Sequence, residues 1–336
     1  MIEVSIIIPC RNEEKFIGKC LESIIKQDYP KEKMEVLVVD GMSEDKTRER
    51  IEEFKIKNLK LKIKILDNPN KFTPFGLNIG VKNAKGEIII RMDAHATYEK
   101  NYISKCVKYL NEYNADNVGG VMKTLPRENT LFGRAVALAL SSSFGVGKST
   151  FRKGSKKPKW VDTVFGGCYK REVFDKIGLF NENLLKGQDM EFNLRLKKAG
   201  GKILLHPEIV SYYYARSKLN LSFCRFYFGE GFWAVYPAKF VGKSFIFLWR
   251  LIPFAFVSSL IITAILSFFS PFFKWLFIFI VSFYFLANLY FSFLIAIKEK
   301  DFRYFFVLPL IFALIHISYG FGSIYGFFKL LFPKTK

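Results

Sequence analysis

The 336-residue chain is poor in cysteine, and its few cysteines are not arranged in pairs. The five are Cys10, Cys20, Cys106, Cys168 and Cys224, and no two of them form a Cys-x-x-Cys motif. Their odd number and wide spacing argue against a disulfide framework and against a structural zinc site. We therefore expect the chain to occupy a reducing compartment.

Acidic residues are scarce relative to basic ones, which gives a formal net charge of +21 at pH 7. A surplus of this sign is typical of proteins that bind nucleic acid, membrane surfaces or phosphate-bearing ligands, although a generally Lys-rich composition has the same effect. The sequence lacks a helix-turn-helix, zinc-finger spacing and an RNA-binding aromatic motif, so we expect no nucleic-acid partner. Anionic lipid headgroups and a diphosphate ligand account for the charge instead.

The beginning of the chain has no feature of a secretion signal. The segment MIEVSIIIPC contains neither a basic leading region nor a small-residue cleavage site. It matches a buried strand, so we expect the N-terminal domain to stay in the cytoplasm.

Charged residues are absent from three long stretches near the end of the chain, at residues 251–273, 275–297 and 304–328. Each is longer than the roughly 20 residues that a helix needs to cross a bilayer. We predict a multi-pass membrane domain at 244–336 with about three transmembrane helices. Basic loops lie predominantly on the cytoplasmic side of a membrane. We therefore predict that the basic loop 298–303, and with it the N-terminal domain, lies on the cytoplasmic side of the cell membrane. A re-entrant course of the last stretch is the alternative.

Two further segments combine unusual side chains. Residues 217–243 mix aromatic with basic residues, which predicts an amphipathic segment lying in the membrane interface, with an ordinary core helix as the alternative. A short apolar helix is expected near residues 131–140. The segment 148–159 after it is rich in lysine and arginine, and is either a solvated loop or a lid that faces a phosphate or an acceptor.

Strand and helix patterns alternate over the first part of the chain. Strands are expected at residues 4–9, 34–40, 61–66 and 87–93, and helices at 13–27, 44–54 and 74–84. This alternation predicts an α/β fold in which a mostly parallel sheet has helices on both faces. Ligands gather at the carboxyl ends of such strands, where Asp40 and Asp93 stand.

Four segments resemble the family 2 glycosyltransferases, in the order and spacing of that family. The first half is matched by SIIIPCRNEEKFIGKCLESI, VLVVDGMSEDKT and IIIRMDAHA, and the second half by VFGGCYKREVFDKIGLFNENLLKGQDMEFNLRLKKAGG. The resemblance covers residues 3–206 and is closest to membrane-anchored exopolysaccharide glycosyltransferases of the succinoglycan type. It implies a Rossmann-like GT-A domain at 1–216, an inverting mechanism and a divalent cation, Mn²⁺ or Mg²⁺.

The resemblance also assigns the donor-binding residues. Pro9, Arg11 and Glu13 lie where the family binds the nucleoside of the nucleotide-sugar. Asp40 lies where the family contacts the base or the ribose.

The metal site is implied by the family's Asp-x-Asp motif. Asp93 matches its metal-binding aspartate, which also serves the nucleotide-sugar, and His95 replaces the second aspartate. Imidazole is a softer ligand than carboxylate and would suit Mn²⁺ better than Mg²⁺.

The catalytic base is implied by the family's Glu-Asp motif. Asp189 matches the aspartate that takes the proton of the acceptor hydroxyl, and Gln188 replaces the glutamate, so the pair carries one charge rather than two. Glu191 is the next candidate for the base.

The implied activity is transfer of a sugar, first expected from a UDP-sugar, to a membrane-associated and lipid-linked saccharide in polysaccharide or glycoconjugate synthesis. A polyprenyl-phosphate sugar synthase is the alternative. A nucleotidyltransferase would need a glycine-rich loop after the first strand, whereas this loop reads CRNEEKF. A transport or scaffold protein would carry ionisable groups in its spans, and among these only His316 is found.

Overall fold

The computed structural model describes residues 1–332, apart from the side chain of Lys243, and these residues form two compact units. The sheet unit contains residues 1–123 and 150–214. The helical unit contains residues 124–149 and 215–332. The chain thus enters the helical unit at residue 124, returns to the sheet unit at residue 150 and leaves it again at residue 215. The domain limits predicted at residues 216 and 243 remain predictions.

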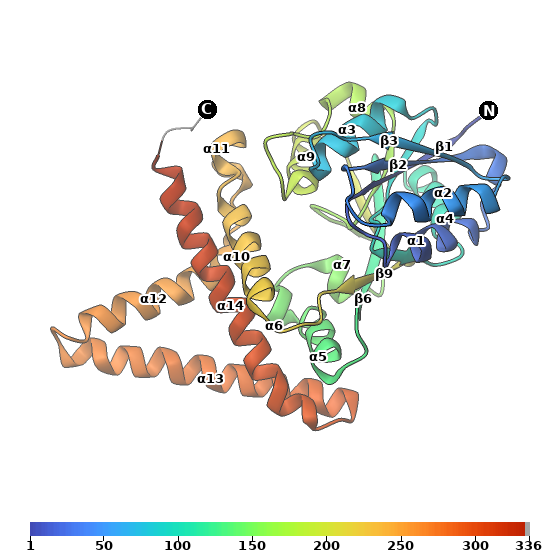
Figure 1. The fold of residues 1–336 in the computed structure, drawn as a ribbon. Helices are drawn as coiled ribbons and strands as arrows, with labels where there is room; N and C mark the ends of the chain where they lie inside the picture. Colours follow the sequence, from blue (N-terminus) through green and yellow to red (C-terminus); the bar gives the residue numbers. More distant parts are fainter. Residues whose placement is uncertain (333–336) are drawn as a thin grey trace. The chain divides into compact units, whose positions relative to one another are not determined.

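One sheet organises the sheet unit, with the strand order β3-β2-β1-β4-β8-β6-β9-β5 and β7 paired to β9 (Figure 1). The bounds are β1 Val4–Cys10, β2 Met34–Asp40, β3 Lys62–Asp67, β4 Ile88–Arg91, β5 Ala96–Tyr98, β6 Asn117–Pro126, β7 Lys159–Trp160, β8 Cys168–Lys170 and β9 Ile203–Ala215. Strands β1 to β4 run parallel, while β8 is antiparallel to β4 and β6, and β5 and β7 are antiparallel to β9. The predicted α/β fold is confirmed, and its later strands make the sheet mixed.

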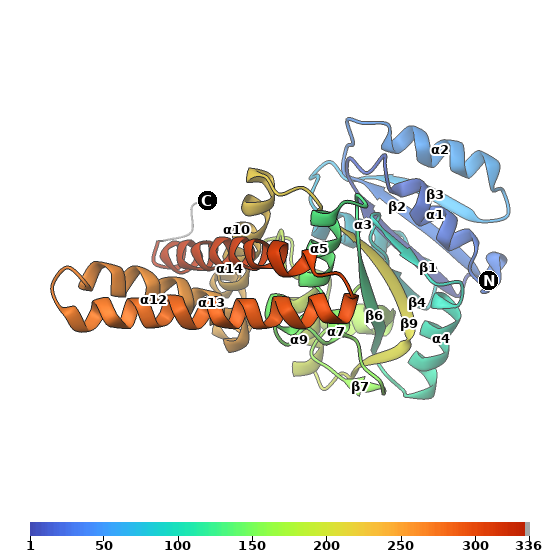
Figure 2. The same cartoon turned by 90° about the horizontal axis from the view of Figure 1, so that it is seen from below.

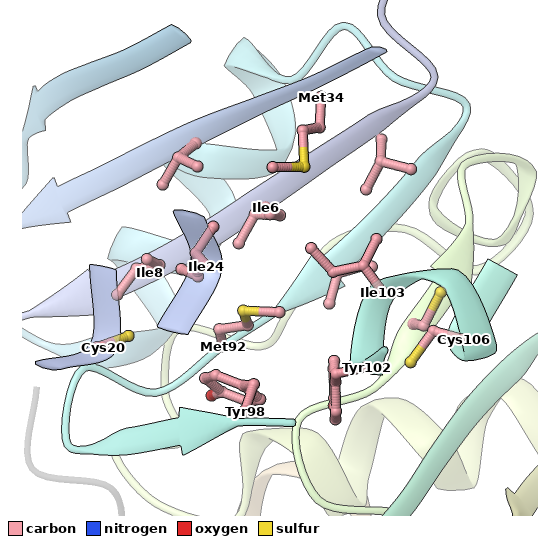
Figure 3. Close-up of a cluster of buried hydrophobic side chains, with 14 of the residues drawn as sticks. Ile6, Ile8, Cys20, Ile24, Met34, Met92, Tyr98, Tyr102, Ile103 and Cys106 are labelled. Atoms are coloured by element: carbon pink, nitrogen blue, oxygen red, sulfur yellow. The ribbon is translucent and has the colours of Figure 1, made fainter. Parts of the chain in front are cut away.

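The central strands are buried on both faces. Every residue of β2 is buried, and in β1 only Pro9 is partly exposed. Side chains alternate along a strand, so Ile6 and Ile8 belong to one hydrophobic cluster and Ile7 to the cluster on the opposite face. Figure 3 shows the first cluster, to which Ile8 of β1 and Ile24 of the first helix both belong. Such double burial is typical of parallel strands that helices cover on both sides.

Helices cover both faces of the sheet. Their bounds are α1 Ile17–Ile25, α2 Thr47–Lys57, α3 Thr73–Asn83, α4 Tyr102–Glu112, α7 Thr150–Lys153, α8 Glu172–Ile177 and α9 Gln188–Lys198, with a 3₁₀ turn at Lys31–Lys33. Helices α1 and α4 contribute Leu21 and Ile103 to the first cluster. Helices α3 and α9 contribute Leu77 and Phe192 to the second.

The helical unit is dominated by long apolar helices. Its bounds are α5 Leu131–Ala139, α6 Ser143–Val146, α10 Leu221–Val235, α11 Ala238–Val241, α12 Ile252–Leu266, α13 Pro271–Glu299 and α14 Arg303–Leu330, with 3₁₀ turns at Lys243–Phe245 and Leu248–Leu251. Three helical segments, Leu248–Leu266, α13 and α14, are long and apolar enough to cross a membrane. Their presence after the α/β domain confirms the predicted architecture and supports membrane association. Which side each end faces remains a prediction.

The helix ends are displaced from the predicted charge-free stretches. Helix α12 ends at Leu266, and α13 begins at Pro271, inside the stretch predicted to be continuous from 251 to 273. Proline is favoured in the first turn of a helix, where a backbone N–H has no partner in any case. The segment 267–270 therefore becomes the turn between two antiparallel helices (Figure 2).

Helix α10, which covers most of the predicted interfacial segment, lies along α14 (Figure 1). Glycines permit the close approach. A Cβ on Gly231 would stand 1.9 Å from the carbonyl oxygen of Tyr319, and a Cβ on Gly322 would stand 1.9 Å from that of Phe228. Ser323 of α14 also donates a hydrogen bond of 3.1 Å to the Gly231 carbonyl.

His316 is a packed residue of α14, 9% exposed. One ring nitrogen is 3.0 Å from the Tyr284 hydroxyl and the other is 2.9 Å from the carbonyl oxygen of Phe144 in α6. Both ring nitrogens thus have partners within the helical unit, which gives His316 a structural role.

Candidate active site

The carboxyl ends of β1, β2 and β3 lie at one edge of the sheet. Their last residues, Cys10, Asp40 and Asp67, stand opposite one another in parallel register. Asp40 is 1% exposed, and its carboxylate accepts a hydrogen bond of 2.6 Å from the Ser43 hydroxyl. Arg48 lies 3.7 Å from Asp40 and 2.6 Å from Asp67. These contacts hold the Asp40 carboxylate in one orientation at the position predicted for the base or ribose.

The loops that follow β1 and β2 are connected by hydrogen bonds. The Asn12 N–H donates to the Ser43 hydroxyl at 2.9 Å, and the Glu44 N–H donates to the Asn12 side-chain oxygen at 2.9 Å. The Glu13 N–H donates to the Thr47 hydroxyl at 2.7 Å. Asn12 has a φ of 55°, which asparagine tolerates better than most residues. The loop after β1, which carries the predicted nucleoside-binding residues Arg11 and Glu13, is therefore held in place by hydrogen bonds to the loop after β2.

Pro9 and Arg11 belong to this region of the sheet edge. Pro9 lies within β1, opposite Val39. Arg11 forms an exposed ion pair of 3.4 Å with Glu44. Exposed pairs contribute little to stability, so a ligand can compete for the Arg11 guanidinium.

Arg91, the last residue of β4, joins the predicted metal-binding residue to the predicted base. Its guanidinium lies 3.0 Å from the carboxylate of Asp93 and 3.3 Å from that of Asp189. The Arg91 side chain is 10% exposed, the Asp93 side chain 15% and the Asp189 side chain 28%. The carboxylates of Asp93 and Asp189, which belong to different segments of the chain, therefore share the Arg91 guanidinium as an ion-pair partner.

The carboxylates of Asp93 and Asp189 stabilise the charged form of Arg91. Burial alone would lower the pKa of the guanidinium, but the charges of Asp93 and Asp189 raise it above its ordinary value. Arg91 therefore stays protonated at every physiological pH and offsets part of the negative charge of the two carboxylates.

Glu13 and His95 form a second contact between the loop after β1 and the segment after β4. The Nδ1 atom of His95 lies 2.9 Å from a carboxylate oxygen of Glu13. The Tyr213 ring of β9 packs edge-on against the imidazole, with ring centroids 5.1 Å apart. This contact leaves the His95 Nε2 atom and the second Glu13 oxygen outside the hydrogen bond.

Asp93, His95 and Glu13 supply donor atoms of the types that divalent cations accept. Within residues 1–332, no three His, Cys, Asp or Glu side chains converge as a ready-made metal site. Mg²⁺ and similar ions are commonly held by one or two carboxylates together with substrate phosphates and water. The residues present fit a cation of this kind, which would complete its coordination with a diphosphate.

The predicted base stands at the beginning of α9. Asp189 lies in the first turn, behind Gly187 in the left-handed conformation, and its carboxylate accepts a hydrogen bond of 3.0 Å from the Met190 N–H. Gln188 is 5% exposed, and its side-chain oxygen has no hydrogen-bond partner within the described residues. Glu191 is buried and forms two hydrogen bonds with Arg195, of 2.6 Å and 3.0 Å. Glu191 is thus committed to a structural pair and is poorly placed to act as the alternative base.

The structure brings Asp93 and Asp189 together through Arg91, and Glu13 together with His95. Asp40 belongs to the neighbouring strand end and has its own partners, Ser43 and Arg48. Sequence analysis did not assign a role to Arg91. A charged residue at the end of the apolar strand IIIR was the available signal, because an arginine is rarely buried without a partner.

The sequence model described as Glycosyl transferase family 2 matches residues 5–178. The chain is 33% identical, over 95% of both chains, to the dolichyl N-acetyl-α-D-glucosaminyl phosphate 3-β-D-2,3-diacetamido-2,3-dideoxy-β-D-glucuronosyltransferase of Methanococcus voltae. It is 31% identical to the succinoglycan biosynthesis protein ExoA of Rhizobium meliloti, over 67% of each chain.

A solved structure shares the fold. The mannosyltransferase PcManGT from Pyrobaculum calidifontis, in complex with GDP-Man and Mn²⁺, superposes with a TM-score of 0.65 over 97% of this chain and 87% of its own. The two sequences are 18% identical. This likeness confirms the predicted fold class.

Proposed function

The chain belongs to glycosyl transferase family 2 and is a glycosyltransferase that uses a nucleotide-sugar donor, and we propose that it acts on a lipid-linked saccharide. The observation that carries this proposal is the similarity to the Methanococcus voltae enzyme along nearly the whole of both chains. The name of that enzyme specifies a dolichyl-phosphate-linked sugar as its acceptor. The three long apolar helices support an acceptor that resides in a membrane.

The proposed reaction is an inverting displacement. Asp189 accepts the proton of the acceptor hydroxyl, and the acceptor oxygen forms a bond to the anomeric carbon of the sugar. The bond from that carbon to the diphosphate oxygen breaks, and its electron pair leaves with the nucleoside diphosphate. Arg91 orients the Asp189 carboxylate through the 3.3 Å ion pair and keeps its position fixed relative to Asp93.

The donor is held, in this proposal, by the sheet edge. Asp40 contacts the base or ribose, and Pro9 and Arg11 border the nucleoside. Asp93, with Glu13 and His95 beside it, would hold a Mn²⁺ or Mg²⁺ ion. A bound cation supplies positive charge that neutralises the diphosphate leaving group.

A saccharide hydroxyl fits this site better than a bare lipid phosphate, the acceptor of a polyprenyl-phosphate sugar synthase. A phosphate monoester is largely deprotonated at neutral pH, because its second pKa is about 6, and needs no general base. A hydroxyl does need one, and the Asp189 carboxylate lies at a partly exposed position beside the predicted donor site.

The proposal is tested with the purified full-length protein and a panel of UDP-, GDP- and dTDP-sugars. Each donor is offered with a polyprenyl-phosphate-linked N-acetylhexosamine, with polyprenyl phosphate alone, or without acceptor, and released nucleotide is measured. We expect nucleotide release that depends on the saccharide-bearing lipid. Release that depends on polyprenyl phosphate alone would assign the synthase activity instead.

A further inference from the structure

The basic segment 148–159 contains Arg152, an arginine for which the described residues provide no charged partner. Residues 150–153 form the short helix α7 of the sheet unit, and β7 at the end of the segment pairs with β9 (Figure 2). Lys153, Lys156 and Lys157 are exposed to solvent, whereas Arg152 is only partly exposed. Arg152 therefore differs from the lysines around it.

The Arg152 guanidinium packs against two aromatic rings. It lies 5.5 Å from the ring centroid of Tyr213 and 5.9 Å from that of Phe151. Its Nη1 atom is buried and forms no hydrogen bond within the described residues. The cation–π contacts fix the position of the guanidinium without using its hydrogen-bond donors.

Other arginines of the sheet unit that are withdrawn from solvent have polar partners. Arg91 pairs with two carboxylates, Arg171 donates two hydrogen bonds to the Gly86 carbonyl, and Arg195 pairs with Glu191. A buried donor without a partner is unfavourable, and each such group in a native structure calls for an explanation. A ligand that brings acceptor oxygens to Arg152 provides one.

Tyr213 connects Arg152 to the predicted donor site. Tyr213 pairs with Ala96 across β5 and β9, and its ring lies against the imidazole of His95, with 5.1 Å between centroids. His95 in turn contacts Glu13 at 2.9 Å. One aromatic ring thus separates the guanidinium from the groups that fit a cation and its diphosphate.

Arg152 carries the positive charge in this region that suits an anionic ligand. Glu13, Asp93 and Asp189 are carboxylates, and the nearby Arg91 is already paired with two of them. Arg152 forms no ion pair within residues 1–332, so its positive charge remains available. The planar fork of a guanidinium also matches the geometry of phosphate oxygens.

We propose that Arg152 binds the diphosphate of the nucleotide-sugar donor. This inference rests on the proposed function and adds a binding residue that the family motifs did not indicate. It also assigns part of the segment 148–159 to phosphate binding, one of its two interpretations from sequence. The positive charge of Arg152 would stabilise the negative charge that develops on the diphosphate as its bond to the sugar breaks.

The test compares wild type, Arg152→Gln, Arg152→Lys and the control Lys153→Gln, all full length in the same detergent. Dissociation constants for UDP and GDP are measured by calorimetry with MnCl₂ present, using whichever nucleotide the wild type binds. We expect Arg152→Gln to weaken binding by roughly tenfold or more, as for loss of a hydrogen bond to a charged group. Arg152→Lys should fall between, because it keeps the charge but not the fork, and Lys153→Gln should bind as the wild type.

Thermal unfolding separates binding from folding. Arg152→Gln removes a buried donor that has no partner within the described residues, and also the two cation–π contacts, so the two effects offset each other and its melting temperature without ligand should stay close to that of the wild type. The increase in melting temperature that the nucleoside diphosphate causes in the wild type should be smaller in this variant.

Two results would overturn the inference while leaving the proposed function intact. One is unchanged nucleoside diphosphate affinity in Arg152→Gln with unchanged kinetics, which would make the segment a solvated loop. The other is unchanged affinity with a raised KM for the lipid-linked acceptor, which would assign Arg152 to the acceptor's phosphate. Failure of the wild type to bind any nucleoside diphosphate would overturn both the inference and the proposed function.

Discussion

The guanidinium of Arg91 lies 3.3 Å from the carboxylate of Asp189, although 98 positions separate the two residues in the chain. The same guanidinium holds Asp93 at 3.0 Å. The buried Arg91 side chain therefore fixes the distance between Asp93, which is predicted to bind the donor, and Asp189, which is predicted to activate the acceptor.

Replacement of Arg91 should damage both stability and turnover. Arg91→Met leaves two carboxylates without their common partner, and loss of one member of a buried ion pair typically costs about 3–5 kcal/mol. We expect a clearly lower melting temperature and a large fall in kcat, with partial recovery of both in Arg91→Lys. Lys55→Met, which removes only an exposed pair with Glu52, is the control for stability. Wild-type stability and turnover in Arg91→Met would show that the ion pairs have no role.

The metal prediction concerns Asp93 and His95. We expect Asp93→Ala and excess EDTA each to abolish transfer, and Mn²⁺ to restore the chelated wild type at least as well as Mg²⁺. His95→Asp replaces imidazole with a hard oxygen ligand and should raise the ratio of activity in Mg²⁺ to activity in Mn²⁺. Full activity in excess EDTA would contradict this assignment.

The parallel part of the sheet could be predicted from the sequence, because strand and helix patterns depend on residues that are close together in the chain. Alternating strand and helix patterns gave β1 to β4 and the helices between them, and the apolar stretches gave three long helices. The role of Arg91 was not readable, since it depends on Asp93 and Asp189 meeting in space. It could not be predicted either that α5 belongs to the helical unit, because the sequence of a short apolar helix does not specify the surface against which it packs.

The glycine contacts between α10 and α14 predict a stability effect in the helical unit. A Cβ at position 231 would stand 1.9 Å from a backbone oxygen of α14, so Gly231→Ala requires the helices to separate. We expect a loss of about 1–3 kcal/mol, as for overpacking in a core. Gly18→Ala in α1 is the control, because a Cβ there meets nothing within 4 Å. Equal melting temperatures for Gly231→Ala and wild type would contradict the close packing.

Membrane orientation is tested in the loop between α13 and α14. With Cys224 replaced by serine, the remaining native cysteines are buried. Lys300→Cys should then react with an impermeant maleimide only after the cells are permeabilised. Phe268→Cys, in the turn between α12 and α13, should react in intact cells. Labelling of Lys300→Cys from outside would reverse the predicted orientation or change the number of spans.

The central claim is that Asp189 is the base of a sugar transfer, and kcat of Asp189→Asn measures it most directly. A side chain that only caps α9 contributes about 1 kcal/mol of stability, and its replacement leaves the chemistry largely intact. Loss of a general base typically costs roughly 10²–10⁴-fold in rate. We predict that Asp189→Asn folds, binds the nucleotide-sugar with near-normal affinity, and transfers sugar to the lipid-linked acceptor at least about a hundredfold more slowly. Turnover close to that of the wild type would contradict the account and assign Asp189 to structure alone.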